Sequence, residues 1–243
     1  MKAAPAAQLL LLDVQARDTA IAQAEHKRKT LPEHEAIADG QKRRAKVMAD
    51  LVAADTQVGD LEGELARAEA DLAPVRERKA RDERRIADGA ADPKALNAMI
   101  DEVAHLGRRI GELEDAQLDV MERLEAATAA REELRAEKSR LEDELRSAMK
   151  SREAKSSQLQ AAIDEEQAER DRLAADVPAD LLALYDRIRA RSGGLGAARL
   201  VGRRCEGCQI EANASAMADY QAAADDDVVR CEECERILVR GAA

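Results

Sequence analysis

The sequence predicts a mainly α-helical protein, in which a long antiparallel coiled-coil hairpin precedes a small C-terminal β domain. Two observations lead to this fold. Apolar residues recur at alternating spacings of four and three through most of the chain, and the only four cysteines form two Cys-x-x-Cys pairs near the C-terminus. The composition agrees, since 37% of the 243 residues are charged and neither Phe nor Trp occurs. Long helices that bury a narrow seam need few aromatic residues, whereas globular cores usually contain them.

The first half of the chain contains two predicted helical segments that meet at Pro32. Residues 6 to about 30 form the first, and because proline removes a backbone donor, we expect a kink at Pro32 rather than a domain boundary. Pro74 should bend the second helix without ending it. The seam positions are Leu10, Val14, Ile21, Ala24 and Leu31, then Ile37, Gly40, Arg44, Val47, Leu51, Ala54, Val58, Leu61, Leu65, Ala68, Leu72, Val75, Lys79, Asp82 and Ile86.

A tight reversal is predicted at residues 88–93. Gly89 can take the left-handed conformation that ends a helix, Asp92 can cap the next helix, and Pro93 suits its first turn. The spacing of four and three then resumes and extends to about Asp176. This second seam contains Leu96, Met99, Val103, Leu106, Ile110, Leu113, Gln117, Val120, Leu124, Ala127, Arg131, Leu134, Lys138, Leu141, Leu145 and Ala148, and weakens through Leu159, Ala162 and Leu173.

Two arms of similar length joined by a short turn favour an antiparallel hairpin within one chain. Residues whose numbers sum to about 180 should then lie side by side, and the N-terminus should return close to Val177. The alternative is two separate helices that each pair with another chain.

A shorter helix is predicted after Pro178, over residues 179–191, with Leu181, Leu184, Tyr185 and Ile188 on one face. Ser192-Gly193-Gly194 then breaks the helical pattern and marks a domain boundary. We therefore divide the chain into the hairpin (1–176), this connecting helix (177–192) and the cysteine-containing domain (193–243).

The C-terminal domain should consist of short strands around the two cysteine turns. Strand-like alternation covers residues 199–201, 228–229 and 237–239. Ser215 is a candidate cap for a short helix that runs through Met217 and Tyr220, and residues 225–227 should form a solvated turn.

The cysteine spacing indicates one structural zinc ion. The ligands are Cys205, Cys208, Cys231 and Cys234, because each two-residue gap aims two sulfurs at one ion and two such turns complete a tetrahedral thiolate shell. The alternatives are two disulfides or four free thiols. No apolar stretch is long enough to span a membrane, and the run Leu9-Leu10-Leu11-Leu12 is too short for a signal peptide. We therefore expect a cytoplasmic protein without a membrane partner, whose thiols stay reduced.

Four segments around the cysteine pairs and the reversal carry a family resemblance: Arg204-Cys205-Glu206-Gly207-Cys208, Val228-Val229-Arg230-Cys231-Glu232-Glu233-Cys234, Arg236-Ile237-Leu238-Val239-Arg240 and Asp92-Pro93-Lys94-Ala95-Leu96. In these segments the chain resembles bacterial C4-type zinc-ribbon proteins with a long N-terminal helical hairpin, in particular the actinobacterial members. The resemblance covers nearly the whole chain and implies a binding or adaptor protein, for which nucleic-acid binding and chaperone roles have both been described. One position departs from the family, because Glu235 follows Cys234 where relatives commonly have glycine.

The residues themselves give no catalytic pattern, so we expect neither an enzyme nor a small-molecule substrate. His26, His34 and His105 all fall on the predicted hairpin, where a solvated histidine is the ordinary interpretation. Carboxylates alternate with arginine and lysine at helical spacing, which is typical of surface ion pairs.

Nucleic acid is one candidate partner, as either RNA or DNA. The net charge of −11 opposes nonspecific binding, and residues 195–243 contain six arginines and nine carboxylates. Two segments, 26–48 and 134–155, are nevertheless rich in basic residues and should form a band at one height of the hairpin. The alternative is that such charges are ordinary solvated faces. The candidate nucleic-acid-binding residues are Lys27, Arg28, Lys29, Lys42, Arg43, Arg44, Arg203, Arg204 and Arg240.

A protein is the other candidate partner, and we favour it. A long hairpin with exposed seam edges can hold a partner helix, while Ile210, Met217 and Tyr220 could form a small anchoring surface on the ribbon. The sequence thus predicts a non-enzymatic, chaperone-like adaptor, with nucleic-acid binding as the alternative.

Overall fold

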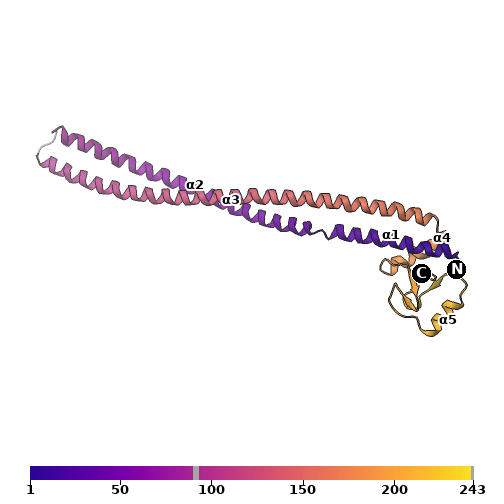
Figure 1. Ribbon diagram of the computed structural model, residues 1–243. Helices are drawn as coiled ribbons and strands as arrows, with labels where there is room; N and C mark the ends of the chain where they lie inside the picture. Colours follow the sequence, from indigo (N-terminus) through magenta and orange to yellow (C-terminus); the bar gives the residue numbers. More distant parts are fainter. Residues whose placement is uncertain (90–92, 242–243) are drawn as a thin grey trace. The chain divides into compact units, whose positions relative to one another are not determined.

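The protein is described by a computed structural model for residues 1–89 and 93–241, most of which are helical (Figure 1). These residues form two compact units, one of Met1–Glu35 with Met149–Ala243 and the other of Ala36–Ala148. No helix of the described part is long and apolar enough to cross a membrane. The four longest helices are α1 (Pro5–Lys29), α2 (Pro32–Ala87), α3 (Pro93–Ala175) and α4 (Ala179–Arg191).

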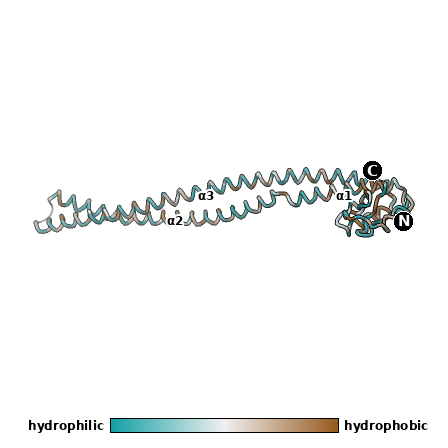
Figure 2. Tube along the Cα trace, turned by 60° about the horizontal axis from the view of Figure 1, so that its bottom comes forward, coloured by the Kyte–Doolittle hydropathy of each residue, from teal (hydrophilic) through white to brown (hydrophobic). Residues whose placement is uncertain are grey.

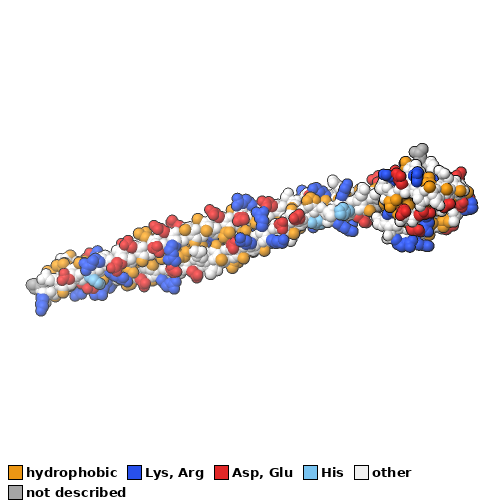
Figure 3. All heavy atoms as spheres, turned by 90° about the horizontal axis from the view of Figure 1, so that it is seen from below, with side chains coloured by type: hydrophobic (Ala, Val, Ile, Leu, Met, Phe, Trp, Pro, Cys, Tyr) orange, Lys and Arg blue, Asp and Glu red, His pale blue; other side chains and the backbone are white. Residues whose placement is uncertain are grey.

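In the unit of residues 36–148, α2 and α3 lie antiparallel along each other (Figure 1). Val58 and Leu61 of α2 form a buried cluster with Ala127 of α3. Every predicted seam position in this unit is buried or half-buried except Arg44. The hairpin within one chain is therefore confirmed, and charged side chains of both signs are interleaved over its visible face (Figure 3).

The interhelical ion pairs fix the register of this hairpin. Arg44 Nε lies 3.1 Å from Glu142 Oε1, and Arg123 Nη1 lies 3.3 Å from Glu64 Oε2. The residue numbers of these two pairs add to 186 and 187. The expected sum of about 180 was therefore too low, because the arms pair about a point near residue 93 instead of residue 90.

The helix ends at the reversal agree with their prediction where the structure describes them. Gly89 has a φ of +63°, the left-handed conformation expected after the last turn of α2. Helix α3 begins at Pro93, where the missing N–H removes no intrahelical hydrogen bond. Asp92, the expected cap of α3, lies outside the described residues.

Pro32 produces a break between two helices, not the expected kink. Helix α1 ends at Lys29, and Thr30 closes its last turn by donating its N–H to the carbonyl of His26 (3.0 Å). Pro32 then occupies the first position of α2, because a proline is tolerated where the N–H would be unpaired anyway. Pro74, by contrast, lies inside α2 as predicted.

The other unit has one core shared by α1, α4 and the C-terminal sheet. Leu11 and Tyr185 are fully buried there, together with Ile237 of the sheet. Val177 belongs to the same cluster as Ala3, so the predicted return of the chain to its N-terminus is confirmed. Hydrophobic residues are concentrated in this part of the chain (Figure 2). The predicted limits of the connecting helix and the ribbon both lie inside this unit.

The C-terminal sheet has the strand order β2-β1-β4-β3. β1 runs parallel to β4 and antiparallel to β2, and β3 is antiparallel to β4. A short helix, α5, lies between β2 and β3 in the chain. Its N-terminal cap is Asn213 and not Ser215, because the Asn213 Oδ1 accepts the N–H of Ala216 at 2.8 Å. The elements are β1 (Ala197–Val201), β2 (Arg204–Cys205), α5 (Ala214–Ala222), β3 (Val229–Arg230) and β4 (Ile237–Val239).

Candidate metal centre

The first cysteine pair lies on a turn that begins at Cys205, the last residue of β2. The N–H of Gln209 donates to the carbonyl of Cys205 at 2.8 Å, and the N–H of Cys205 donates to the carbonyl of Ile210 at 3.1 Å. These two bonds close the turn over Glu206 and Gly207. The side chains of Cys205 and Cys208 consequently leave the turn on one side.

The second cysteine pair repeats this geometry. The N–H of Glu235 donates to the carbonyl of Cys231 at 2.8 Å, and Cys231 donates to the carbonyl of Arg236 at 2.9 Å. The residue after the second cysteine of each turn is left-handed, with φ of +61° at Gln209 and +64° at Glu235. A side chain in that region costs about 1 kcal/mol. Glu235, which stands where relatives commonly have glycine, therefore carries this strain, and Gln209 carries it as well.

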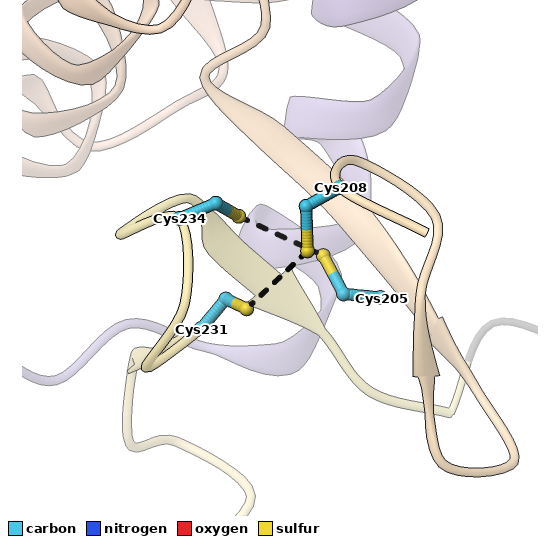
Figure 4. Close-up of side chains that lie close together, drawn as sticks. All are labelled: Cys205, Cys208, Cys231 and Cys234. Carbon is cyan, nitrogen blue, oxygen red and sulfur yellow. Dashed lines mark hydrogen bonds between the residues drawn. The ribbon is translucent and has the colours of Figure 1, made fainter. Parts of the chain in front are cut away.

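The four sulfur atoms converge on one point (Figure 4). Cys205 Sγ lies 3.9 Å from Cys234 Sγ, Cys208 Sγ lies 3.9 Å from Cys231 Sγ, and all four ligand atoms are within 4.8 Å of one another. Zinc with sulfurs at about 2.3 Å in a tetrahedron requires sulfur separations of about 3.8 Å, whereas a disulfide requires about 2.0 Å. The residues therefore fit one structural Zn²⁺, and the four thiolates leave no coordination position for a substrate.

The electrostatic setting of the cysteines differs from one to another. Burial raises the pKa of Cys205, and it raises the pKa of Cys231 to about 12. Burial also opposes ionisation of Cys234, but the backbone N–H and side chain of Arg236 and the neighbouring thiols lower the pKa of Cys234 below its ordinary value. Zinc binds thiolates, so loading the site releases protons from the buried cysteines.

Arg236 holds the two cysteine turns to the end of α4. Its guanidinium donates to the carbonyls of Ser192 (2.7 Å), Leu195 (3.0 Å) and Gly207 (3.2 Å). A Cβ on Gly207 would lie 2.7 Å from Cδ of Arg236, so only glycine allows this approach. These hydrogen bonds give Arg236 a structural role in the ribbon.

Helix α5 packs against the second cysteine turn. The hydroxyl of Tyr220 accepts the N–H of Glu232 at 3.1 Å, and Tyr220 packs with Ala216 and Leu238 against the buried cysteines. Tyr220 is therefore mostly buried and is unable to form the exposed anchoring surface expected for it, while Ile210 remains exposed.

A buried polar cluster joins α1 to α3 and α4, and the sequence reasoning missed it. Asp18 is 3% exposed, and its carboxylate accepts the Tyr185 hydroxyl at 2.6 Å. The same carboxylate pairs with Arg170 (3.3 Å) and Arg189 (3.2 Å). One signal was available in the sequence, since Asp18 follows Val14 by four residues and precedes Ile21 by three, which places a carboxylate on the apolar seam.

Gln15 extends this cluster to the chain that enters β1. Its Oε1 accepts the N–H of Gly196 at 2.6 Å and the Tyr185 hydroxyl at 3.2 Å. Its Nε2 donates to the carbonyl of Gly194 at 2.9 Å. Gln15, a residue of α1, is thus the hydrogen-bond partner of backbone groups at the start of the ribbon. These hydrogen bonds hold the ribbon to the helices.

The N-terminus provides a third connection between α1 and the ribbon. Ala3 donates its N–H to the carbonyl of Asp226 at 2.7 Å, and Val228 donates to the carbonyl of Met1 at 3.0 Å. Lys2 Nζ lies 2.8 Å from Asp226 Oδ1. The predicted turn at residues 225–227 is present, but it is paired with the N-terminus and so is not simply solvated.

The candidate arginines of the ribbon are used within the protein. Arg240 donates to four backbone carbonyls between residues 220 and 227 at 2.6–2.9 Å. Arg203 donates to the carbonyl of Ala212, and Arg204 pairs with Glu211 at 3.4 Å. None of these contacts arranges the three guanidiniums around a common ligand.

The candidate basic residues of the helices belong to different units, Lys27, Arg28 and Lys29 to one and Lys42, Arg43 and Arg44 to the other. Arg28 donates to Gln160. The second group pairs with carboxylates, Lys42 with Asp39 (3.2 Å), Arg43 with Glu144 (3.8 Å) and Arg44 with Glu142 (3.1 Å). Lys27 and Lys29 are exposed and have no partner among the described residues.

Two domain families match the chain. Residues 14–193 match the CT398-like coiled coil hairpin domain, and residues 204–238 match the C4-type zinc ribbon domain. The protein Rv2229c of Mycobacterium tuberculosis is 35% identical over 240 residues, which covers 99% of this chain and 98% of that protein. ML1638 of Mycobacterium leprae is 27% identical over 219 residues, 89% of this chain and 93% of that protein.

Solved structures share the fold. A protein of Mycobacterium smegmatis superposes with a TM-score of 0.82 at 36% identity, covering 99% of this chain and all of that one. CT398 of Chlamydia trachomatis gives a TM-score of 0.64 at 17% identity, with 96% and 97% of the two chains covered. HP0958 of Helicobacter pylori gives 0.52 at 14% identity, with 98% of each chain covered. The last two show the fold alone.

Proposed function

The chain belongs to the CT398-like coiled-coil hairpin family, and from this premise we propose that it is a non-enzymatic, chaperone-like adaptor that binds a protein partner through its hairpin and zinc ribbon. Its two domains, a coiled-coil hairpin and a zinc ribbon, are of kinds that are generally non-catalytic. The zinc site supports this proposal, because four thiolates fill the coordination shell and leave zinc without a position for substrate.

The observation that carries the proposal is the exposed apolar surface of the hairpin. α2 and α3 bury their seam residues against each other, yet Val52 is 64% exposed and Leu118 is 55% exposed on the outer surface of the hairpin. More than half of the surface of each of these side chains is left uncovered by the pairing of the two helices. Coiled-coil surfaces of this kind can hold a further helix.

A cytoplasmic location is part of the proposal. All four cysteines are free thiols arranged for metal, and thiols persist in a reducing compartment. We propose neither a membrane partner nor a small-molecule substrate.

Nucleic acid remains the alternative partner, with less support. Arg240 and Arg44 would have to leave their present partners to reach phosphate, and the two tyrosines, Tyr185 and Tyr220, are buried and so cannot stack on bases. Replacing Lys42, Arg43 and Arg44 by Glu should abolish RNA or DNA retention in a gel-shift assay if this alternative holds.

The test is affinity purification of the tagged full-length protein from its native cells after chemical crosslinking, with and without nuclease. The adaptor proposal expects defined protein partners that survive nuclease digestion. The same purification with the Lys42, Arg43 and Arg44 to Glu variant provides the matched control, because protein partners should persist there. Loss of all captured material on digestion would reject the adaptor function in favour of nucleic-acid binding.

A further inference from the structure

The hairpin of residues 36–148 has two distinct sides, which its interhelical ion pairs define. On one side Asp55 pairs with Arg135 (3.4 Å) and Arg76 with Glu114 (2.5 Å). The seam residues occupy positions a and d of heptads written abcdefg. The residues of these two ion pairs occupy position e, directly after a d residue. Position g, directly before each a residue, lies on the other side, where the pairs are Arg43 with Glu144, Arg78 with Glu102 and Arg123 with Glu64.

All the exposed large apolar side chains of this unit fall on the first side. They are at positions e and b, and no described residue at positions g and c adds to them. Val52 and Leu118 protrude furthest, with 64% and 55% of their surface exposed. We call this surface the apolar side. Its exposed large residues are Met48, Val52, Ile100, Leu118 and Met121.

The apolar side also allows close approach of another backbone. Every b position of α2 from residue 38 to residue 80 is apolar or glycine and is exposed. At Gly59 an added Cβ would meet nothing within 4 Å, so no contact within the chain explains a glycine that costs a helix about 1 kcal/mol relative to alanine. These positions are Ala38, Ala45, Val52, Gly59, Ala66, Ala73 and Ala80.

The charges around the apolar side are predominantly negative. Its e and b positions contain eight carboxylates and three arginines, a balance of −5, whereas the g and c positions contain nine basic and eleven acidic residues, a balance of −2. A bound helix with flanking basic residues would therefore be attracted to the apolar side. A second copy of this protein would be repelled there, because its own apolar side carries the same eight carboxylates. The carboxylates are Asp55, Glu62, Glu69, Glu83, Glu114, Glu125, Glu132 and Glu142.

We propose that the apolar side binds one amphipathic helix of a partner protein, with an apolar stripe flanked by lysine or arginine. The stripe packs on Val52, Leu118 and their apolar neighbours, and the small b residues of α2 let the helix lie close. The flanking basic residues face the carboxylates of positions e and b. This inference rests on the proposed adaptor function and specifies the chemistry of its partner.

A synthetic peptide tests this proposal with the full-length zinc-loaded protein. The probe is a four-heptad helix with leucine on one stripe and lysine beside it, and a second peptide has glutamate in place of lysine. Val52→Arg with Leu118→Arg disrupts the apolar side. The matched control is Ala53→Arg with Ala126→Arg, which adds the same charge at exposed positions of the other side.

The expected result in fluorescence anisotropy is binding of the lysine peptide to the wild type and to the control, and at least about 30-fold weaker binding to the disrupted variant. The glutamate peptide should not bind. The proposal is overturned if the wild type does not bind the lysine peptide, if both variants lose it equally, or if sedimentation shows a dimer that only Val52→Arg with Leu118→Arg dissociates.

The same variants separate this inference from the adaptor function. If nuclease-resistant protein partners are captured equally by the disrupted variant and the wild type, the apolar side is not their binding site, while the adaptor function stands. If no protein partner is captured by any form, the adaptor function itself fails.

Discussion

Replacing Tyr185 by phenylalanine removes a single hydroxyl from the buried polar cluster that joins α1, α3 and α4. That hydroxyl donates to the carboxylate of Asp18 at 2.6 Å, and Tyr185 is fully buried. A hydrogen bond to a charged group contributes about 1.5–3 kcal/mol, and the ring of phenylalanine preserves the packing. We therefore expect Tyr185→Phe to lower the free energy of opening of this unit by about 2 kcal/mol.

Asp18→Ala should lower the free energy of opening of this unit by more than Tyr185→Phe does. It leaves Arg170, which is 16% exposed, and Arg189, which is 32% exposed, without their shared carboxylate. Removing one partner of a buried ion pair costs about 3–5 kcal/mol. The partial exposure of Arg189 and the remaining ion pair of Arg170 with Asp186 (2.9 Å) favour the lower end of that range. In the Asp18→Ala background the hydroxyl of Tyr185 has lost its charged acceptor and keeps only the longer hydrogen bond to Gln15 Oε1 (3.2 Å). The double variant should therefore be more stable than the sum of the single effects by at least about 1 kcal/mol.

Native-state hydrogen exchange in peptides from α4 (Ala179–Arg191) measures these effects, because α4 contains both Tyr185 and Arg189. Peptides from the other unit, around Val58 of α2, provide an internal control and should not change. Unaltered exchange in α4 after Tyr185→Phe, or effects of Tyr185→Phe and Asp18→Ala that add without coupling, would refute the assignment of this cluster as a structural connection.

Three further predictions follow from the zinc site and its surroundings. Cys205→Ser with Cys231→Ser should reduce the zinc content from one ion per chain to none by elemental analysis, while far-UV circular dichroism stays strongly helical; an unchanged metal content would show the ligand assignment to be wrong. Burial and the hydrogen bond to Asp18 raise the pKa of Tyr185, so its stabilising contribution is complete below about pH 10 and is lost as the pH rises above that value. Denaturant unfolding should consequently show wild-type stability falling more steeply above pH 10 than that of Tyr185→Phe, and parallel curves would contradict this. Gln209→Gly and Glu235→Gly should each stabilise the ribbon by less than about 1 kcal/mol. The residues have φ of +61° and +64°, but each substitution also removes an exposed side-chain contact, from Gln209 Nε2 to the Glu206 carbonyl (2.7 Å) or between Glu235 and Arg230. A loss of stability in chelator-challenge unfolding would argue against this.

Most of the helical fold could be predicted because its signals are local or periodic. The spacing of four and three identified the seam from Ile37 to Ala148, and the structure buries or half-buries all of it except Arg44. The connecting helix begins and ends at the predicted residues, since a proline precedes it and Ser192 with two glycines follows it. The four zinc ligands could be identified for a similar reason, because their spacing follows from the geometry of the metal.

The parts that were missed depend on contacts between distant residues. Gln15 and Asp18 read as polar interruptions of α1, and their role appears only when Tyr185 and Gly196 are brought beside them. Arg240 is a candidate nucleic-acid-binding residue in the sequence, yet in the structure its guanidinium donates to carbonyls at the end of α5 and in the chain that follows. Near the end of α3 the sequence pattern places Ala162 in the seam, whereas the structure buries Ile163. The periodic signal is weak there because several residues of α3 that contact α1 are polar.

The most direct test of the adaptor function is site-specific photocrosslinking in living cells. A benzophenone side chain would be placed at Leu118 on the apolar side and, in a second strain, at Ala126 on the other side, both of which are exposed. The adaptor function predicts one or more defined protein adducts from position 118 that resist nuclease and are absent or much weaker from position 126. Adducts to nucleic acid alone, or equal protein adducts from both positions, would contradict it.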